Sequence, residues 1–500
     1  MVTVFNMPLE NKLKILEESV QSHLNAIGQI GRDPIGGWTR LAFSPEEQEA
    51  HDYAKKIFEQ GGYIIRIDAF GNLIASKEGK NPNKKRVMLG THLDTVSNGG
   101  NYDGVVGFIT AVEAVKLAEA EKGQLDYGID VVIFRAEEST RFKRACLGSS
   151  AAFGFLSHAD IQNLVYGDEP NLTSLEQAIK ENRGDTSKIG TRLIDPLQYF
   201  AYLETHIEQA DVLTKKGMDI GIVTSIRAPE RRKITVRGKN CIRAVAEMVL
   251  SVENIATKYA KEEKDIAGTV GKVNGYFDGQ LNNINTIPGN VQFQLSKWDD
   301  NLREKYNLIA EQRGVKYCMT EENNEYIIGV NGTTDHSGGT PMGFKFRKDA
   351  LAAACEMILK TDDYALPPQE EITFYTDLRS NDVTTRNLIQ REVGSAFDAY
   401  ATKYNVKVNA FVTEQSEPVK SLDIDLQRRL EESAKQLDLS YMYLPSGAGH
   451  DAMKAAQAGI PTVMLFVPSR NGSHNPTEFA ENRNIAYAIM VGANFLTNLK

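Results

Sequence analysis

The chain has 500 residues, of which 41% are hydrophobic and 25% are charged. This length exceeds one compact core and predicts two or three domains, and the composition excludes a disordered or fibrous protein. The net charge of -9, without a concentrated Lys/Arg run, argues against nucleic acid as a partner.

Localisation signals are scarce in the sequence. No stretch approaches the roughly 18 consecutive apolar residues of a membrane span, so we expect no membrane partner. The first residues include neither a basic segment nor an apolar run, so we expect no export signal. The 4 cysteines show no CxxC spacing, which argues against a disulfide framework or a thiolate zinc site and predicts a cytoplasmic protein.

The first 210 residues alternate helical and strand patterns. Ser44 and Glu47 predict a helix start, with Ser44 as N-cap and Glu47 closing a capping box. Such alternation predicts an α/β sheet with helices on its faces, in which ligands gather where loops leave the carboxyl ends of strands. The apolar runs predict strands at 63–67, 72–75, 87–89 and 128–134 and a helix at 107–119, with polar segments at 91–107 and 136–142.

From about residue 226 the pattern changes to two successive blocks that share an order of elements. Each block resembles a β-α-β-β-α-β unit, and the second lacks one strand. The α/β pattern then returns, with a helix at 423–437 and a strand at 461–467. We therefore predict one α/β domain from 1–225 and 415–500, and an inserted α+β region of two ferredoxin-like lobes, 226–320 and 321–414.

Four of the 8 histidines lie in polar or Gly-rich surroundings beside carboxylates: His92, His206, His450 and His474. A single histidine of this kind is usually structural, and we interpret His450, in a Gly-rich turn, in that way. In GTHLDTVSNGGNYDGVVG, Asp94 follows His92 by two residues on the same side of a strand end, where it could fix the imidazole tautomer.

Adjacent carboxylates at Glu137 and Glu138 end an apolar strand. Their like charges would repel unless a cation or a proton lies between them. Together with Asp103, His206 and His474 they form a set of nitrogen and oxygen donors that suits Zn²⁺, Mn²⁺, Co²⁺ or Ni²⁺. Two such ions about 3.5–4 Å apart, bridged by a carboxylate and a water, would form a hydrolytic centre.

Seven motifs resemble, in this order, those of the N-carbamoyl-L-amino acid hydrolase, β-ureidopropionase and allantoate amidohydrolase group of the di-metal amidase and exopeptidase family. The resemblance covers nearly the whole chain except part of the central region, and the segment 36–58 also resembles the opening of that group. The motifs are GTHLDTVSNGGNYDGVVG, AEESTRF, ETHIEQ, DHSGGTPM, TDLRS, SGAGHDAM and SHNPTE.

The resemblance implies a metal-dependent hydrolase of linear C–N bonds, with a di-metal exopeptidase-like catalytic domain and a lid over it. The expected substrate is a small carboxylate-bearing molecule such as an N-carbamoyl amino acid. One ion would be held by His92 and His206 and the second by Glu138 and His474, and Asp103 would bridge the two.

Further roles follow from the resemblance. Glu137 would be the general base and Asp94 would orient His92. His336 would stabilise the oxyanion and Arg379 would bind the substrate carboxylate. Gln209 and Asn285 would add polar contacts to the substrate.

Several of these roles have alternatives. Glu137 and Glu138 could exchange roles. Arg379 could instead be a structural partner of Asp377, and His336 could be only a turn residue. The same di-metal centre could serve a dipeptidase or an aminoacylase, or the chain could be a non-catalytic binding relative, although an intact Glu137 argues against the last.

The two central blocks divide the family motifs between them. The first block keeps NTIPG but has QLSKWDD where a DLRS motif is expected, whereas DHSGGTPM and YTDLRS lie in the second block. Relatives dimerise through their lids, and a histidine of one subunit reaches the other's active site. A doubled lid could supply that histidine within one chain, so we expect a monomer with a pseudo-dimeric lid, with a homodimer as the alternative.

Overall fold

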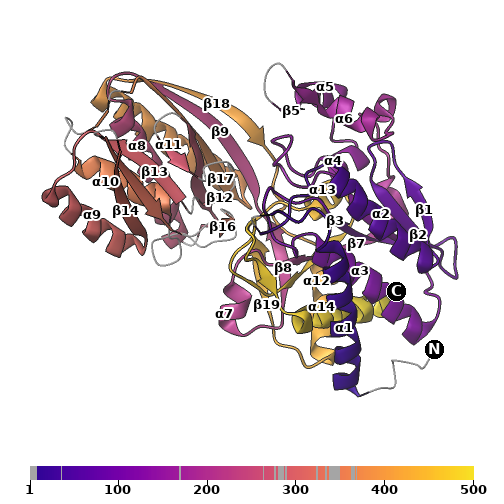
Figure 1. Ribbon diagram of the computed structural model, residues 1–500. Helices are drawn as coiled ribbons and strands as arrows, with labels where there is room; N and C mark the ends of the chain where they lie inside the picture. Colours follow the sequence, from indigo (N-terminus) through magenta and orange to yellow (C-terminus); the bar gives the residue numbers. More distant parts are fainter. Residues whose placement is uncertain are drawn as a thin grey trace. The chain divides into compact units, whose positions relative to one another are not determined.

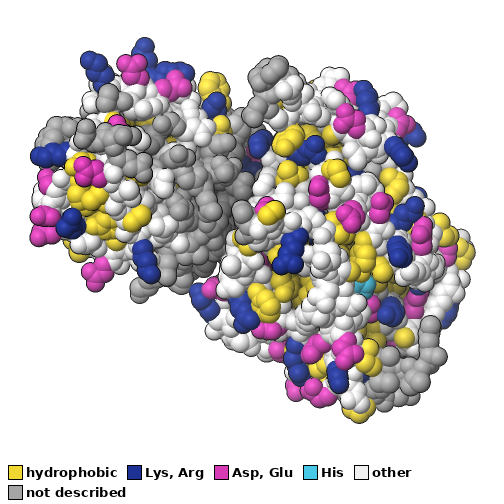
Figure 2. All heavy atoms as spheres, in the orientation of Figure 1, with side chains coloured by type: hydrophobic (Ala, Val, Ile, Leu, Met, Phe, Trp, Pro, Cys, Tyr) yellow, Lys and Arg dark blue, Asp and Glu magenta, His cyan; other side chains and the backbone are white. Residues whose placement is uncertain are grey.

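The computed structural model divides the chain into two compact units, unit 1 (Met1–Ile226 and Ser421–Lys500) and unit 2 (Arg227–Lys420) (Figure 1). These boundaries lie close to the predicted ones at 225 and 415. On the face that Figure 2 shows, Lys and Arg side chains are interspersed with Asp and Glu over each unit. The structure describes residues 8–34, 36–167, 171–262, 264–274, 277–279, 286–287, 290–322, 325–332, 335–336, 349–361, 366–367 and 369–499.

Unit 1 is built on an eight-stranded mixed sheet in the order β1-β2-β4-β3-β7-β20-β8-β19. Within it, β4, β3, β7 and β20 are neighbours and run parallel. The sheet confirms the predicted α/β fold, and its central strands end at one edge. The strands are β1 (Ile64–Ile67), β2 (Leu73–Lys77), β3 (Arg86–His92), β4 (Ile129–Phe134), β7 (Tyr199–Ile207), β8 (Ile220–Ile226), β19 (Tyr441–Ser446) and β20 (Thr462–Val467), with short pairs β5 (Val165–Tyr166) and β6 (Thr173–Ser174), and β21 (Ser469–Arg470) and β22 (Phe479–Ala480).

Helices cover the sheet and bury a continuous apolar core, in which α3 packs against α14. Helix α3 is buried along most of its length, so its sequence is apolar on nearly every side. Among the helices of the described part of the chain, none is long and apolar enough to cross a membrane. The helices of unit 1 are α1 (Leu9–Ile27), α2 (Pro45–Gln60), α3 (Val105–Lys122), α4 (Leu147–Ala152), α5 (His158–Asn163), α6 (Leu175–Glu181), α7 (Val212–Lys216), α12 (Ile424–Gln436), α13 (Asp451–Gln457) and α14 (Asn482–Asn498).

The predicted start of α2 is correct in position but differs in its capping contacts. The Oγ of Ser44 accepts the backbone N–H of Glu47 at 3.2 Å, as a capping box requires. The carboxylate of Glu47, however, accepts the N–H of Phe43 and pairs with Arg135, 3.0 Å away. This buried ion pair links α2 to the segment that follows β4.

Unit 2 contains two four-stranded sheets, in the orders β10-β17-β9-β18 and β11-β13-β15-β14. The pairings in both sheets are antiparallel. A short pair, β12 (Thr286–Ile287) and β16 (Asp335–His336), accompanies them. The elements are β9 (Ala228–Arg237), β10 (Ala267–Asn274), β11 (Asp278–Gly279), β13 (Asn290–Leu295), β14 (Lys316–Glu322), β15 (Glu325–Asn331), β17 (Glu371–Ser380), β18 (Lys407–Gln415), α8 (Cys241–Lys261), α9 (Asp300–Arg313), α10 (Ala350–Lys360) and α11 (Val383–Tyr404).

The two sheets do not correspond to the two predicted consecutive lobes, 226–320 and 321–414. The first sheet joins β9 and β10 from the first block to β17 and β18 from the second, and the second sheet joins β13 and β14 to β15. Each sheet therefore takes strands from both blocks.

Cross-strand pairs give a physical reason for this exchange. In the first sheet, buried Arg231 on β9 lies opposite Asp377 on β17 and Glu414 on β18, and its guanidinium pairs with both. In the second sheet, apolar residues of β13 and β15 face each other, such as Phe293 and Ile328. Strands from the two blocks therefore pair where their charged and apolar side chains match. The order of the strands along the chain does not reveal this matching.

Candidate metal centre

The carboxyl ends of four parallel strands in unit 1 position the predicted site. His92 is the last residue of β3, and Glu137 and Glu138 follow β4 within a few residues. His206 lies at the end of β7, and His474 lies in the loop that follows β20. These are the positions where α/β sheets bind ligands.

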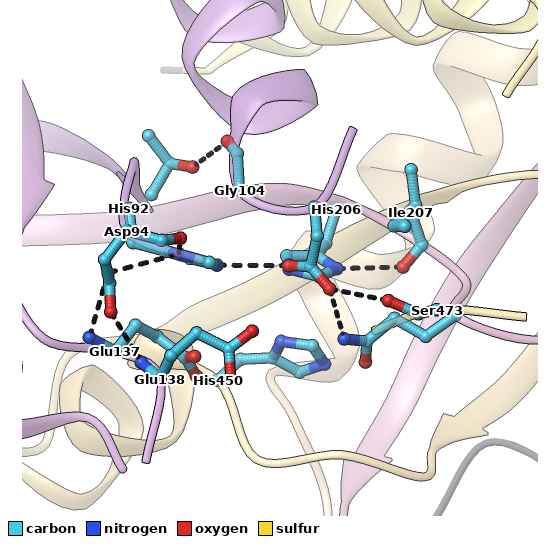
Figure 3. A network of polar contacts seen from close by, with 12 residues as sticks. His92, Asp94, Gly104, Glu137, Glu138, His206, Ile207, His450 and Ser473 are labelled. Carbon is cyan, nitrogen blue, oxygen red and sulfur yellow. Dashed lines mark hydrogen bonds and ion pairs between the residues drawn. The ribbon is translucent and has the colours of Figure 1, made fainter. Parts of the chain in front are cut away.

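Asp103 lies at the centre of the cluster, directly before α3. Its Oδ1 is 3.3 Å from Nε2 of His92 and 3.0 Å from Nε2 of His206. The two imidazoles stack with ring centroids 5.8 Å apart, and Figure 3 shows both in one polar network. Asp103, His92 and His206 are buried, and their potential ligand atoms lie within 4.8 Å of one another.

A second group of buried donors shares Asp103. The Nε2 of His474 is 3.2 Å from Oε1 of Glu138 and 3.8 Å from the other oxygen of Asp103, Oδ2. These ligand atoms also lie within 4.8 Å of one another. The two carboxylate oxygens of Asp103 therefore face two different donor sets, the geometry expected of a carboxylate that bridges two cations.

The imidazole tautomers suit cation binding. Nδ1 of His206 lies 2.9 Å from the carbonyl oxygen of Ile207, and Nδ1 of His92 lies 3.1 Å from that of Asp94. Because a carbonyl oxygen only accepts, Nδ1 carries the proton in each ring and Nε2 keeps its lone pair for a metal ion. Nε2 of His92 is buried and makes no hydrogen bond within the described residues. The donor set thus fits divalent cations.

Asp94 fixes the segment that carries the two glutamates. Its Oδ1 accepts the backbone N–H of Glu137 at 3.2 Å, and its Oδ2 accepts that of Glu138 at 2.9 Å (Figure 3). Its Oδ1 also lies 3.4 Å from Nδ1 of His92. Asp94 thereby couples the position of a candidate ligand to that of the candidate base.

The site residues also perturb one another electrostatically. Burial raises the pKa of Glu137 well above its usual value; His92 opposes this shift, and the nearby Glu138 and Asp451 add to it. Burial would likewise raise the pKa of Asp103, but His206 and His92 hold it well below its usual value. Such perturbed groups are typical of functional sites.

Three residues at the site have left-handed backbone conformations, with φ of 55° at Ala136, 61° at Gln209 and 63° at His474. This region is disfavoured for residues other than glycine and costs about 1 kcal/mol or more. The surrounding structure must therefore stabilise these turns, and each turn directs a side chain of the cluster.

Gln209 lies in the cluster and contacts Asp103, while the substrate contact expected of it stays a prediction. Its Nε2 donates to Oδ2 of Asp103 at 2.7 Å, and the hydroxyl of Ser473 donates to the same oxygen at 2.8 Å. The carboxylate of Glu478 holds the backbone of the same aspartate, because it accepts the N–H groups of Tyr102 and Asp103, each at 3.0 Å. Ser473 and Glu478 were not predicted as site residues, although both belong to the motif SHNPTE.

Cys146 is a further residue that the sequence analysis did not single out. Its Sγ lies 3.3 Å from Oε1 of Glu137, and its backbone N–H donates to the carbonyl oxygen of Glu137 at 2.8 Å. The residue is fully buried. No spacing motif marks it, because the contact depends on how the loop after β4 folds back.

The predicted contacts from unit 2 have different outcomes. Arg379 is buried, and its guanidinium binds Asp377, with Nε 3.1 Å from Oδ1 and Nη2 2.9 Å from Oδ2. This is the contact that the structural alternative predicted. His336 pairs through its backbone with Thr286, and its side chain lies outside the described residues, as does the whole of Asn285.

A buried histidine–carboxylate centre at the strand ends of a mixed α/β sheet indicates a metal-dependent hydrolytic enzyme. Comparison with known proteins agrees with this class. Residues 88–498 match peptidase family M20/M25/M40. The chain therefore belongs to this family, and it is a hydrolase of C–N bonds.

Two curated relatives match almost the whole chain. The N-carbamoyl-L-amino acid amidohydrolase of Geobacillus stearothermophilus is 27% identical over 493 residues and covers 96% of each chain. The allantoate amidohydrolase of Escherichia coli (strain K12) is 25% identical, covering 96% of this chain and 98% of the relative.

Solved structures support the fold over the same length. The crystal structure of AtUAH in complex with (S)-hydroxyglycine matches with a TM-score of 0.71 at 23% identity, covering 96% of this chain and 97% of that one. A hydantoinase/carbamoylase family amidase from Burkholderia multivorans matches with a TM-score of 0.69 at 19% identity, with the same coverage. At these identities the likeness establishes the fold alone.

Proposed function

We propose that this protein is an N-carbamoyl-amino acid amidohydrolase that uses two divalent cations. The observation that carries the proposal is the position of Asp103, whose two carboxylate oxygens face two buried donor sets beside Glu137. The curated relatives add support, because two of them are named for amidohydrolysis of an N-carbamoyl amino acid and of allantoate.

His92 and His206 would hold one ion, Glu138 and His474 the other, and Asp103 would bridge them. We infer Zn²⁺, Mn²⁺, Co²⁺ or Ni²⁺ from the nitrogen and oxygen donors. When bound, two such ions would lower the pKa of a water molecule and polarise the carbonyl group of the substrate.

Glu137 is the general base in this proposal. Its carboxylate takes a proton from the attacking water and then delivers it to the leaving nitrogen. Asp94 holds the backbone N–H groups of Glu137 and Glu138, so the base and its neighbour stay fixed relative to His92. Gln209 and Ser473 hold Asp103 by donating to its Oδ2.

The proposed substrate is small and carries a carboxylate next to the scissile carbamoyl group. Arg379 is the proposed partner of that carboxylate, and binding would require its guanidinium to contact a second anion besides Asp377. A planar guanidinium with five N–H donors permits two such contacts.

A panel of substrates tests this function. Purified protein reconstituted separately with each of the four metals would be given N-carbamoyl-L-amino acids, allantoate and dipeptides. We expect release of ammonia with carbon dioxide from a carbamoyl substrate. Release of free amino acids from dipeptides alone would support the dipeptidase alternative and contradict the proposal.

The substitution Glu137→Gln separates catalysis from binding. We expect hydrolysis to fall by about 10²–10⁴-fold, the usual contribution of a general base, while metal content stays unchanged. Full activity in Glu137→Gln would show that the mechanism is wrong, and the matched change Glu138→Gln, which should lower metal content, tests whether the two glutamates exchange roles.

We also propose that the chain is catalytically complete as a monomer with a pseudo-dimeric lid. In support, unit 2 contains two four-stranded antiparallel sheets within one chain, although the sheets do not follow the two sequence blocks. Light scattering during gel filtration, combined with activity measurements, tests this. An obligate dimer whose inactive unit 2 variants complement one another across subunits would contradict it.

A further inference from the structure

The loop after β4 folds back on itself so that two segments run side by side. The carbonyl oxygens of Arg135, Ala136 and Glu137 accept successive backbone N–H groups, those of Gly148, Leu147 and Cys146, at 2.8–2.9 Å. This ladder fixes Glu137 against the residue that precedes α4.

A buried asparagine secures the same two segments at their far end. Oδ1 of Asn72 accepts the N–H of Arg135 at 2.9 Å, and its Nδ2 donates to the carbonyl oxygen of Gly148 at 3.0 Å. The backbone around Glu137 is therefore held independently of any side-chain contact to its carboxylate.

The side chain of Cys146 adds a contact that the ladder does not supply. Its Sγ lies 3.3 Å from Oε1 of Glu137 in a fully buried position. Cys146 has a φ of 54°, a left-handed conformation that glycine would adopt without strain. The chain instead has a cysteine at this strained backbone position, and its side chain contacts the carboxylate.

The thiol acts as a hydrogen-bond donor at this position. Burial raises the pKa of Cys146 well above its usual value, and the neighbouring Glu137 carboxylate acts in the same direction. The sulfur therefore keeps its proton, and the S–H group donates a hydrogen bond to the carboxylate. This hydrogen bond is weaker than one from a hydroxyl group would be. A protonated, buried thiol of this kind is a poor nucleophile and a poor metal ligand.

We infer that Cys146 is a positioning residue that holds Oε1 of Glu137 through its S–H group and leaves Oε2 directed at the reacting water. This inference rests on the proposed role of Glu137 as the base. Without the thiol, the carboxylate would rotate more freely about its last side-chain bond, and fewer of its orientations would accept the proton.

Three substitutions test the inference by kinetics, with N-carbamoyl-L-alanine as the substrate. Cys146→Ala removes the donor and should lower kcat about tenfold, the equivalent of one hydrogen bond to a charged group, with KM changed less than about twofold. Cys146→Ser keeps a donor and should retain at least about half of kcat. Cys355→Ala removes another fully buried thiol, in α10 of unit 2, and should leave kcat within about twofold.

The outcomes separate this inference from the proposed function. If Glu137→Gln is inactive but Cys146→Ala keeps kcat within about twofold of the unsubstituted protein, or if Cys146→Ser loses as much as Cys146→Ala, the positioning role is wrong. If instead Glu137→Gln keeps its activity, Glu137 is not the base, and if the unsubstituted protein does not hydrolyse the carbamoyl substrate, the proposed function itself fails.

A spectroscopic measurement tests the contact without activity. The infrared S–H stretching band of Cys146 can be isolated as the difference between the unsubstituted protein and Cys146→Ser. We expect this band to lie at the low frequency of a hydrogen-bonded thiol and to move to higher frequency in Glu137→Gln, because an amide oxygen is a weaker acceptor than a carboxylate. A band that does not move would overturn the inference.

Discussion

Each of the two units buries a cluster of charged side chains, and the clusters differ in how their charges are balanced. In unit 2, the guanidiniums of Arg231 and Arg379 bind the carboxylates of Asp377 and Glu414. Each charge there has a protein partner of opposite sign. The charges of this cluster balance within the protein, and the cluster joins three strands of one sheet.

The cluster in unit 1 has an excess of negative groups. Asp94, Asp103, Glu137 and Glu138 lie together with three histidines that keep their Nε2 atoms directed at carboxylates. Buried Arg40 contributes one positive charge nearby, and burial lowers its pKa to about 10. Like charges at such distances need a cation or a proton between them, so the excess of carboxylates distinguishes this cluster from the charge-balanced cluster of unit 2.

The largest expected effect comes from Asp103→Asn. The substitution keeps the shape of the side chain but removes the charge that two cations would share. We expect activity to fall by at least about 10³-fold, since several kcal/mol of charge stabilisation would be lost. In the chelator-treated protein the charge of Asp103 pairs with His206 and His92, so the unfolding midpoint of Asp103→Asn should fall modestly; loss of the folded state would instead indicate a structural role.

The matched substitution in unit 2, Asp377→Ala, should act on stability. It leaves Arg231 and Arg379 buried without one of their partners, which costs about 3–5 kcal/mol. Denaturant unfolding followed by circular dichroism measures this loss, and metal content should remain unchanged. An unfolding free energy of Asp377→Ala equal to that of the unsubstituted protein would contradict the structural role of the unit 2 cluster.

Asp94→Asn tests the residue that links a ligand to the base. The amide can accept only one of the two backbone N–H groups that the carboxylate of Asp94 accepts from Glu137 and Glu138. We expect a loss of about 10–100-fold in activity or metal affinity, as for other groups that orient metal ligands. Metal titration and kinetics on the same preparation separate the two effects.

The smallest expected effect is the acid sensitivity of unit 2. Burial would raise the pKa of Asp377, but Arg379 and Arg231 lower it below its usual value. A lowered pKa in the folded state means that the stabilisation is present above about pH 4 and is lost as the pH falls through the folded-state pKa. Unfolding midpoints between pH 5 and pH 3 should fall more steeply for the unsubstituted protein than for Asp377→Asn.

The sequence was sufficient to predict the sheet of unit 1 and the grouping of its donors. His92, His206 and His474 each stand at or after the carboxyl end of an apolar strand, so a parallel arrangement brings them together. The apolar runs identified the strands before His92 and His474, and Asp103 follows the first of them in a Gly-flanked turn. The sequence analysis predicted no strand at 199–207, which carries His206, so the family resemblance was needed to place His206 beside His92.

The sequence was not sufficient where contacts depend on distant pairing. The strands of unit 2 exchange between blocks because Arg231 matches Asp377 and Glu414 across the sheet, and chain order does not show that. The contact of Cys146 with Glu137 arises from a loop that folds back in a left-handed turn, for which the sequence has no marker. Such features require the three-dimensional structure.

The most direct test of the Asp103-centred account is metal stoichiometry, measured by elemental analysis after dialysis against one of the four proposed metals. We expect two ions per chain in the unsubstituted protein and in Asp377→Asn, and loss of both in Asp103→Asn. A single ion per chain, or two ions retained in Asp103→Asn, would contradict the assignment of Asp103 as the residue shared by two metal sites.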